Sequence, residues 1–194
     1  MSREIPSIVV ENISDTIESW AKRSYIESEL RERILNSNVL LVPGEGYVDS
    51  DALFFPEGTE QLVEFLRENS PPDVPLEICV EDKDYKELSR YADVVFLASF
   101  IVYKIAAPIV VSLVAGYLKE RLGSKEKGTI AKWSLTVEDK ETGQSTQLSY
   151  EGPAEKLKEQ MQEALELKAI AKPNVIKDAA RHPQKKAKRR RGKK

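Results

Sequence analysis

The densest group of chemically active side chains in this sequence is a run of lysines and arginines at residues 185–194. Eight of these ten residues are basic: Lys185, Lys186, Lys188, Arg189, Arg190, Arg191, Lys193 and Lys194. Such a run attracts phosphate groups through charge and counterion release, without reading a base sequence. No aromatic residue is interleaved with it to stack on bases. We therefore expect these eight residues to contact an anionic partner, either a nucleic acid or another acidic surface, with an anionic membrane as an alternative.

The distribution of charge along the chain points the same way. The formal net charge is only -2, yet residues 1–176 contain 31 acidic and 20 basic residues, whereas residues 177–194 contain ten basic residues and the single acid Asp178. Residues 172–194 have too few apolar side chains to form a core, so we expect a disordered basic tail. Two other roles stay open for this tail: binding the acidic body of its own chain, or keeping the chain in solution without a partner.

Carboxylates gather in two places and could hold Mg²⁺ through oxygen ligands. The first group is Glu45, Asp49, Asp51 and Glu57, and the second is Glu81, Asp82, Asp84 and Glu87. The second group follows a predicted strand, where α/β proteins commonly place their sites. Acids at the start of a helix are also ordinary partners of the helix dipole. A small carboxylate-dependent or Mg²⁺-dependent hydrolase or nuclease, with activity that depends on Asp82 and Asp84, is therefore one alternative.

The remaining residues argue against catalysis. Cys79 is the only cysteine and His182 the only histidine, so no disulfide within the chain, no cysteine-based zinc site and no Cys–His pair in the body can form. The turn Gly44–Gly46 follows a predicted strand but lacks the other glycines and the lysine of a phosphate-binding loop. We expect no cofactor, no metal and no catalytic residue. The favoured interpretation is a cytoplasmic, non-catalytic adaptor or regulatory protein with a protein partner and no small-molecule substrate.

One apolar segment, residues 94–114, needs an explanation of its own. Lys104 is its only charged residue and Pro108 its only proline. Its 21 residues are long enough to cross a bilayer, which would make the chain a membrane-associated or membrane-acting protein. It could instead form a buried strand over residues 94–97 and a helix over 107–118 that begins near Pro108. A helix pair that packs against another subunit is the third interpretation.

Periodicity predicts an α+β fold with a small mixed sheet and packed helices. Residues 14–35 read as one bent helix or two short ones, and Thr59 is a suitable cap for a helix over 60–68. Asp82 is expected to start a helix that runs through Tyr91. Residues 131–137 and 146–150 alternate as a β-hairpin, followed by a helix after Pro153. We expect an N-terminal helical lead-in (1–37), an α/β core (38–122), a hairpin–helix unit (129–171) and the tail (172–194).

Overall fold

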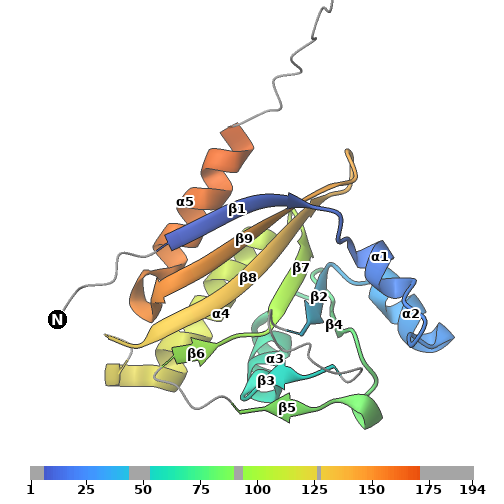
Figure 1. The fold of residues 1–194 in the computed structure, drawn as a ribbon, viewed down its shortest axis with the longest axis horizontal. Helices are drawn as coiled ribbons and strands as arrows, with labels where there is room; N and C mark the ends of the chain where they lie inside the picture. Colours follow the sequence, from blue (N-terminus) through green and yellow to red (C-terminus); the bar gives the residue numbers. More distant parts are fainter. Residues whose placement is uncertain (1–6, 44–52, 90–93, 126–127, 171–194) are drawn as a thin grey trace, which may run out of the picture.

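A computed structural model describes residues 7–43, 53–89, 94–125 and 128–170 of the chain (Figure 1). Their main feature is one mixed sheet with the strand order β1-β9-β8-β7-β2-β4, in which β6 also pairs with β8. Its strands are β1 (Ser7–Ile13), β2 (Val39–Val42), β4 (Leu76–Ile78), β6 (Val94–Phe96), β7 (Ser99–Tyr103), β8 (Ile130–Asp139) and β9 (Gln144–Pro153). A second, two-stranded sheet consists of β3 (Phe55–Pro56) and β5 (Glu87–Leu88). The predicted α+β fold with a mixed sheet is confirmed.

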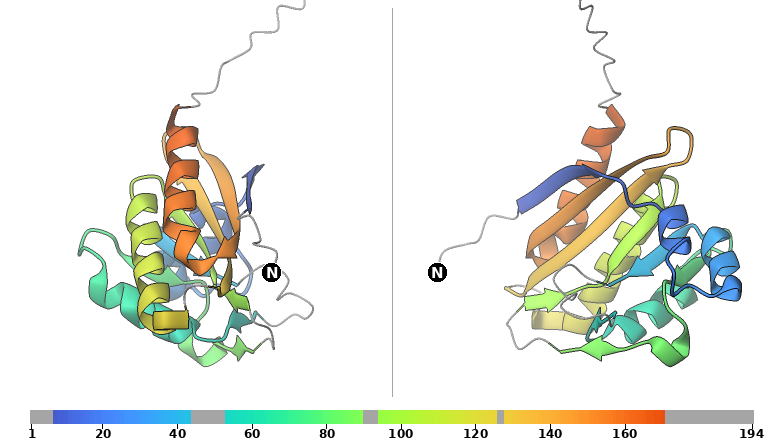
Figure 2. Two further views of the ribbon diagram at one scale, coloured as in Figure 1. Left: turned by 90° about the vertical axis from the view of Figure 1, so that its left-hand side faces the viewer. Right: turned by 45° about the vertical axis from the view of Figure 1, so that its right-hand side comes forward.

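Helices lie along one face of this sheet and at one of its ends (Figures 1 and 2). They are α1 (Ile17–Ala21), α2 (Ser28–Leu35), α3 (Thr59–Asn69), α4 (Ala107–Leu122) and α5 (Leu157–Ile170). Helices α4 and α5 lie side by side along one face of the sheet, and α3 lies beyond α4 (Figure 2). Helices α1 and α2 sit at the β2–β7 end. The N–H of Ile17 at the start of α1 donates to Glu138 Oε2 on β8 at 2.9 Å, which ties α1 to the polar side of that strand.

The β8–β9 hairpin is the longest paired element of the fold. Its antiparallel register runs from Ile130 opposite Pro153 to Asp139 opposite Gln144. Gly143 in the turn has a φ of 66°, a conformation that a glycine adopts without steric cost. One face of β8 is buried and apolar through Ala131, Trp133, Leu135 and Val137. The predicted hairpin followed by a helix is confirmed. It could be predicted because the alternation of apolar and polar residues fixes both the register of the strands and the face that is buried.

The apolar segment forms β6, β7 and α4 and lies in the core. Phe100 and Val102 of β7 and Val111 and Val114 of α4 have no exposed surface. Pro108 lies in the first turn of α4, where its missing N–H has no helical partner to lose. None of the helices in the described ranges is long and apolar enough to cross a membrane. The interpretation of residues 94–114 as strand and helix of the folded core is confirmed. Two strands, β6 and β7, replace the single strand expected over 94–97, and α4 continues to Leu122.

Two local expectations need correction or refinement. Residues 14–35 form two helices, and Thr16 caps the first through a reciprocal bond with Ser19. The helix expected from Asp82 through Tyr91 is wrong: Asp82–Asp84 is a 3-10 turn, and β5 follows it. The backbone there pairs with β3, with Phe55 N–H donating to the carbonyl oxygen of Lys86 at 2.8 Å. This tertiary pairing outweighs the local helical pattern.

The sheet also connects the expected segments of the chain. β1 comes from residues 1–37, β2, β4, β6 and β7 come from 38–122, and β8 and β9 come from 129–171. The lead-in that was expected to be helical therefore supplies an edge strand as well as α1 and α2. The basic tail, residues 172–194, lies outside the described residues.

Candidate functional site

The eight basic residues that sequence analysis selected, Lys185 to Lys194 without Ala187 and Gly192, lie outside the described residues. The structure does show where the chain leads toward them. Helix α5 ends at Ile170, and its last turns extend beyond the edge of the sheet (Figure 1).

Several basic side chains of the folded body are paired with carboxylates. Ion pairs join Lys83 to Glu27 at 2.7 Å, Lys132 to Glu151 at 2.8 Å and Lys104 to Asp139 at 3.3 Å. Residues 53–89 contain ten acidic and only three basic residues. Acidic side chains therefore predominate in this part of the described chain.

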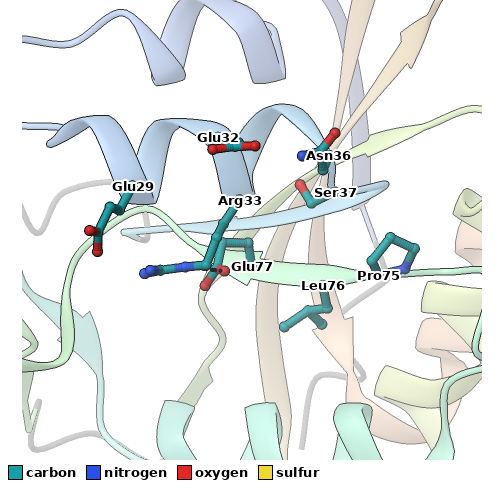
Figure 3. Close-up of a pocket in the computed structure, with 8 residues that line it drawn as sticks. All are labelled: Glu29, Glu32, Arg33, Asn36, Ser37, Pro75, Leu76 and Glu77. Carbon is teal, nitrogen blue, oxygen red and sulfur yellow. Dashed lines mark hydrogen bonds and ion pairs between the residues drawn. The ribbon is translucent and has the colours of Figure 1, made fainter.

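A shallow groove lies between α2 and β4. It has a volume of about 530 Å³ and is open to solvent. Its lining residues are Glu29, Glu32, Arg33, Asn36, Ser37, Pro75, Leu76 and Glu77. Figure 3 shows Arg33 of α2 beside Glu77 of β4, and the two are joined at 3.0 Å between Nε and Oε2. The other arm of Arg33 pairs with Glu81 at 3.0 Å.

The groove holds no catalytic arrangement. Ser37 donates its hydroxyl to the carbonyl oxygen of Ile34 at 2.8 Å, so that hydroxyl serves the end of α2. The only cation that lines the groove, Arg33, is held by two carboxylates. Neither a free cation nor a nucleophile with a neighbouring base lines the described walls. We interpret the groove as a solvated edge of the sheet.

Glu77 closes the outer edge of β4. The backbone of β4 bonds to β2 through Pro75, which accepts the N–H of Val39, and through Cys79, whose N–H donates to Leu41. Because alternate residues of a strand point to opposite sides, the N–H of Ile78 faces away from β2. Glu77 Oε1 accepts this N–H at 2.9 Å while Arg33 holds its other oxygen. The outward donor of this edge strand is therefore occupied by a side chain of the same strand.

The second acidic cluster does not converge on one point. Glu81 pairs with Arg33, whereas Glu87 reaches the start of α3. Within the ranges that the structure covers, no three histidine, cysteine, aspartate or glutamate side chains are arranged to hold a metal ion. In the first cluster, Glu57 accepts a hydrogen bond from Ser89, and Glu45, Asp49 and Asp51 lie outside the described residues. Among the acids whose positions are described, the expected grouping of ligands is not formed.

Glu87 has a structural role that sequence analysis missed. Its carboxylate accepts the N–H of Gly58 at 2.9 Å, the N–H of Glu60 at 2.8 Å and the hydroxyl of Tyr85 at 2.6 Å. Burial alone would raise the pKa of Glu87, but these hydrogen bonds outweigh it and lower that pKa. Thr59, the expected cap, instead donates its hydroxyl to the carbonyl oxygen of Pro56 at 2.6 Å. No local pattern could reveal a cap that lies 29 residues away.

Two side chains of α4 also contact the start of α3. The hydroxyl of Tyr117 donates to the carbonyl oxygen of Gly58 at 3.0 Å, and Arg121 donates to that hydroxyl at 3.1 Å. Gly58 has a φ of 87°, and a side chain there would collide with the guanidinium of Arg121. The positive end of the α3 dipole is thus already satisfied within the protein, so this helix start is not an anion site.

Cys79 is also unsuited to chemistry. Its side chain has no exposed surface, and burial raises the pKa of its thiol to about 12. The neighbouring charge of Arg23 lowers that pKa only in part. The thiolate is the reactive form of cysteine, so Cys79 acts as a small apolar residue of the core.

Comparison with known proteins adds no functional assignment. No protein-family model, no curated protein and no solved structure matches this chain.

Proposed function

We propose that this protein is a non-catalytic adaptor or regulatory protein that binds the phosphate backbone of a nucleic acid through residues 185–194. The observation that supports the proposal is the separation of charge along the chain: eight cations in ten residues follow a folded body in which acids predominate. Such a body repels a polyanion, so binding would be confined to the tail.

Two features of the folded body support the proposal that the tail, and not the body, binds the polyanion. The described cations Arg33, Lys83 and Lys132 are engaged by carboxylates, so they compete poorly for phosphate. The described groove is lined by three glutamates and one cation, Arg33, which two carboxylates hold. Because the tail has no aromatic residue between its cations, contact with bases would add little, and binding should be nearly independent of sequence.

The test compares the full chain with a variant of the same length in which all eight basic residues at positions 185–194 are replaced by glutamine. Binding of a labelled 20-base-pair DNA duplex is followed by fluorescence anisotropy between 50 and 200 mM salt. Neutralising up to eight phosphates predicts a slope of log K against log salt of up to about −7 for the full chain. The glutamine variant should lose binding and this slope.

A matched control replaces Lys119 and Lys125, which are exposed on the folded body, by glutamine and should leave both quantities nearly unchanged. Equal binding by the tail variant and the full chain would refute the proposal. If vesicles of phosphatidylserine bind the tail much more tightly than the duplex at equal phosphate concentration, the partner is an anionic membrane and the nucleic-acid assignment fails.

A further inference from the structure

The two edges of the main sheet differ in how their outward backbone groups are used. β4, at one end, has three residues, and Glu77 Oε1 accepts the outward N–H of Ile78 at 2.9 Å. β1, at the other end, has seven residues and pairs only with β9 among the described strands. β1 contains neither lysine nor proline, which commonly keep an edge strand from pairing, and its one charged residue is Glu11. β1 is therefore the edge at which another strand can add.

The register of the β8–β9 hairpin shows which backbone groups of β9 point toward β1. The N–H of Ala154, just after β9, donates to the carbonyl oxygen of Thr129 at 2.8 Å, so these two residues form a bonded pair. Bonded and non-bonded pairs alternate along an antiparallel ladder. Counted along the register from Ala154, Tyr150 and Leu148 direct their N–H and C=O groups toward β8. Ser149, which lies between them, therefore directs its groups toward β1.

The same alternation continues into β1. Ser149 lies opposite Val9, so the N–H and C=O groups of Val9 bond to β9. Those of Ile8 and Val10, on either side of Val9, therefore point away from the sheet. Asn12 is the third residue of β1 whose backbone groups point outward. Within the described part of the fold, the edge thus offers donors and acceptors at alternate positions of the strand.

Exposed apolar side chains accompany these backbone groups. Val9 is 50% exposed and Val10 is 53% exposed, and within the described ranges they are the only exposed large apolar residues that are adjacent in sequence. Val10 lies opposite Leu148, which is fully buried, so it is on the apolar face of the hairpin. Val9 lies opposite Ser149, whose hydroxyl meets that of Ser134 on the other face. A strand added here would cover one valine on each face of the sheet.

We propose that β1 is the interface of a symmetric dimer, in which β1 of a second copy adds antiparallel to it with Val9 on the two-fold axis. Val9 then faces Val9 of the second copy in a non-bonded pair, the kind of pair whose side chains lie closer together. Ile8 faces Val10 of the second copy, and Val10 faces Ile8 of that copy. Each of these two pairs exchanges two N–H···O bonds, because the backbone groups of Ile8 and Val10 point outward in both copies. All four residues in these pairs are apolar.

The charge of Glu11 favours this register over the neighbouring ones. With Val9 on the axis, Glu11 faces Ser7 of the second copy, and the two Glu11 carboxylates are far apart. Placing Val10 on the axis would bring these carboxylates to diagonal positions, and a further shift would place them directly opposite each other, where like charges destabilise a strand pair. Placing Ile8 on the axis would carry Val10 past the end of β1 in the second copy. The register with Val9 on the axis therefore matches apolar residues and separates the charges.

The state of β4 explains why this pairing would stop at two copies. Pairing of β1 with β4 of another copy would be a head-to-tail contact, which repeats without closing unless its rotation forms a ring. The outward N–H of Ile78 on β4 is already bonded to Glu77, and Arg33 holds the same carboxylate. Pairing of β1 with itself uses the same surface on both copies and closes at two. This inference goes beyond the proposed function and does not depend on it, because residues 185–194 take no part in the interface.

The experiment measures the mass of the full chain by light scattering over a micromolar concentration series, with amide hydrogen exchange on β1 in the same samples. Val9→Glu places two carboxylates face to face on the axis. Val10→Pro removes an outward donor but no bond to β9, and an edge strand tolerates proline at such a position. Ile105→Glu adds the same charge as Val9→Glu at a position that is 81% exposed elsewhere on the chain, and it is the matched control.

A pair of cysteine variants tests the register. Val9→Cys places two thiols opposite each other across the axis, within the separation that a disulfide spans. Val10→Cys places them on a diagonal, at about 7–8 Å between the two positions, which is beyond that separation. The native Cys79 is buried and has a raised thiol pKa, so it does not compete in the folded chain. Oxidised glutathione is added to both variants at the concentration at which the full chain is dimeric.

We expect the full chain to reach twice its mass of 21.9 kDa as its concentration rises. The amides of Ile8 and Val10 should exchange about tenfold more slowly in the dimer than after dilution. Val9→Glu and Val10→Pro should remain monomeric, whereas Ile105→Glu should dimerise as the unmodified chain does. Val9→Cys should form a disulfide between two chains, and Val10→Cys should not.

A full chain that stays monomeric throughout the series would overturn the proposal, and so would a dimer that Val9→Glu and Val10→Pro form equally well. A disulfide through Val10→Cys with none through Val9→Cys would overturn the proposed register. Exchange in β8 serves as the internal reference for intact folding, and a variant that loses protection there is excluded. The dilution of the full chain and the two cysteine variants then still decide the outcome.

Discussion

The carboxylate of Glu87 accepts the backbone N–H of Gly58 at 2.9 Å, across 29 residues of sequence. It accepts the N–H of Glu60 as well, so a side chain from β5 satisfies two of the donors that open the first turn of α3. Tyr117 and Arg121 of α4 contact the same glycine. Gly58 is therefore the residue at which the small sheet β3–β5 contacts both α3 and α4.

Replacing Glu87 by alanine should reduce the free energy of unfolding by about 1–2 kcal/mol, the usual cost of losing a helix cap. Because the folded pKa of Glu87 is below its ordinary value of 4.5, its stabilising effect is present above pH 4.5 and is lost as the pH falls through the folded pKa. Urea unfolding from pH 7 to pH 3 measures this. The difference between wild type and Glu87→Ala should shrink in acid, whereas the exposed control Glu64→Ala should show a small, constant effect.

Replacing Glu77 by valine should leave the outer edge of β4 able to pair with a strand of another molecule. The substitution frees the outward N–H of Ile78 and removes one partner of Arg33. Unpaired, uncharged edges promote strand pairing between molecules. Light scattering over a concentration series should therefore show more self-association for Glu77→Val than for Glu29→Val, a change of the same size in the same groove. Equal behaviour of the two variants would show that Glu77 does not protect the edge.

The burial of the apolar segment, residues 94–114, can be tested by comparing a buried residue with an exposed one. Phe100 is fully buried and meets Trp133 edge-on at 5.6 Å between ring centroids, whereas Ile105 is 81% exposed. Phe100→Ala should cost about 3–5 kcal/mol in chemical unfolding, through lost burial and the cavity left behind. Ile105→Ala should change stability by no more than about 0.5 kcal/mol. Similar costs for both would contradict the packing described.

Cys79 should resist thiol reagents in the native protein. Its thiol is buried and its pKa is raised to about 12, so at pH 8 little thiolate exists and none is accessible. Labelling with a chromogenic disulfide should be very slow without denaturant and rapid in guanidinium chloride. Fast, stoichiometric labelling of the native chain would mean that the strand end around Cys79 opens readily.

Sequence patterns predicted the elements whose side chains alternate or repeat over many residues. The hairpin of β8 and β9 could be located because Ala131, Trp133, Leu135 and Val137 must share a face. The position of α4 could be inferred from Pro108, which tolerates a first turn but not the middle of a helix. Both patterns depend only on residues close together in the sequence, and the structure agrees with them.

The features that escaped prediction are long-range. Glu87 was grouped with Asp82 and Asp84 as a potential ligand, but its partners lie at the start of α3, far away in the sequence. The predicted helix after Asp82 was displaced by pairing with β3, which no pattern within residues 82–91 encodes. The edge status of β1 depends on its pairing with β9, 144 residues away at Ser7 and Glu151. The eight tail residues remain a prediction from composition alone.

The pairing of β1 with β9 also has a consequence for the order of events during protein synthesis. β1 is synthesised before its partner strand, which is made 144 residues later at the Ser7–Glu151 pair. At about 5–20 residues per second, the first strand waits roughly 7–30 s without its neighbour. During that time its valines are open to chaperones or to foreign strands, so the yield of correctly folded chain should respond to the rate of translation.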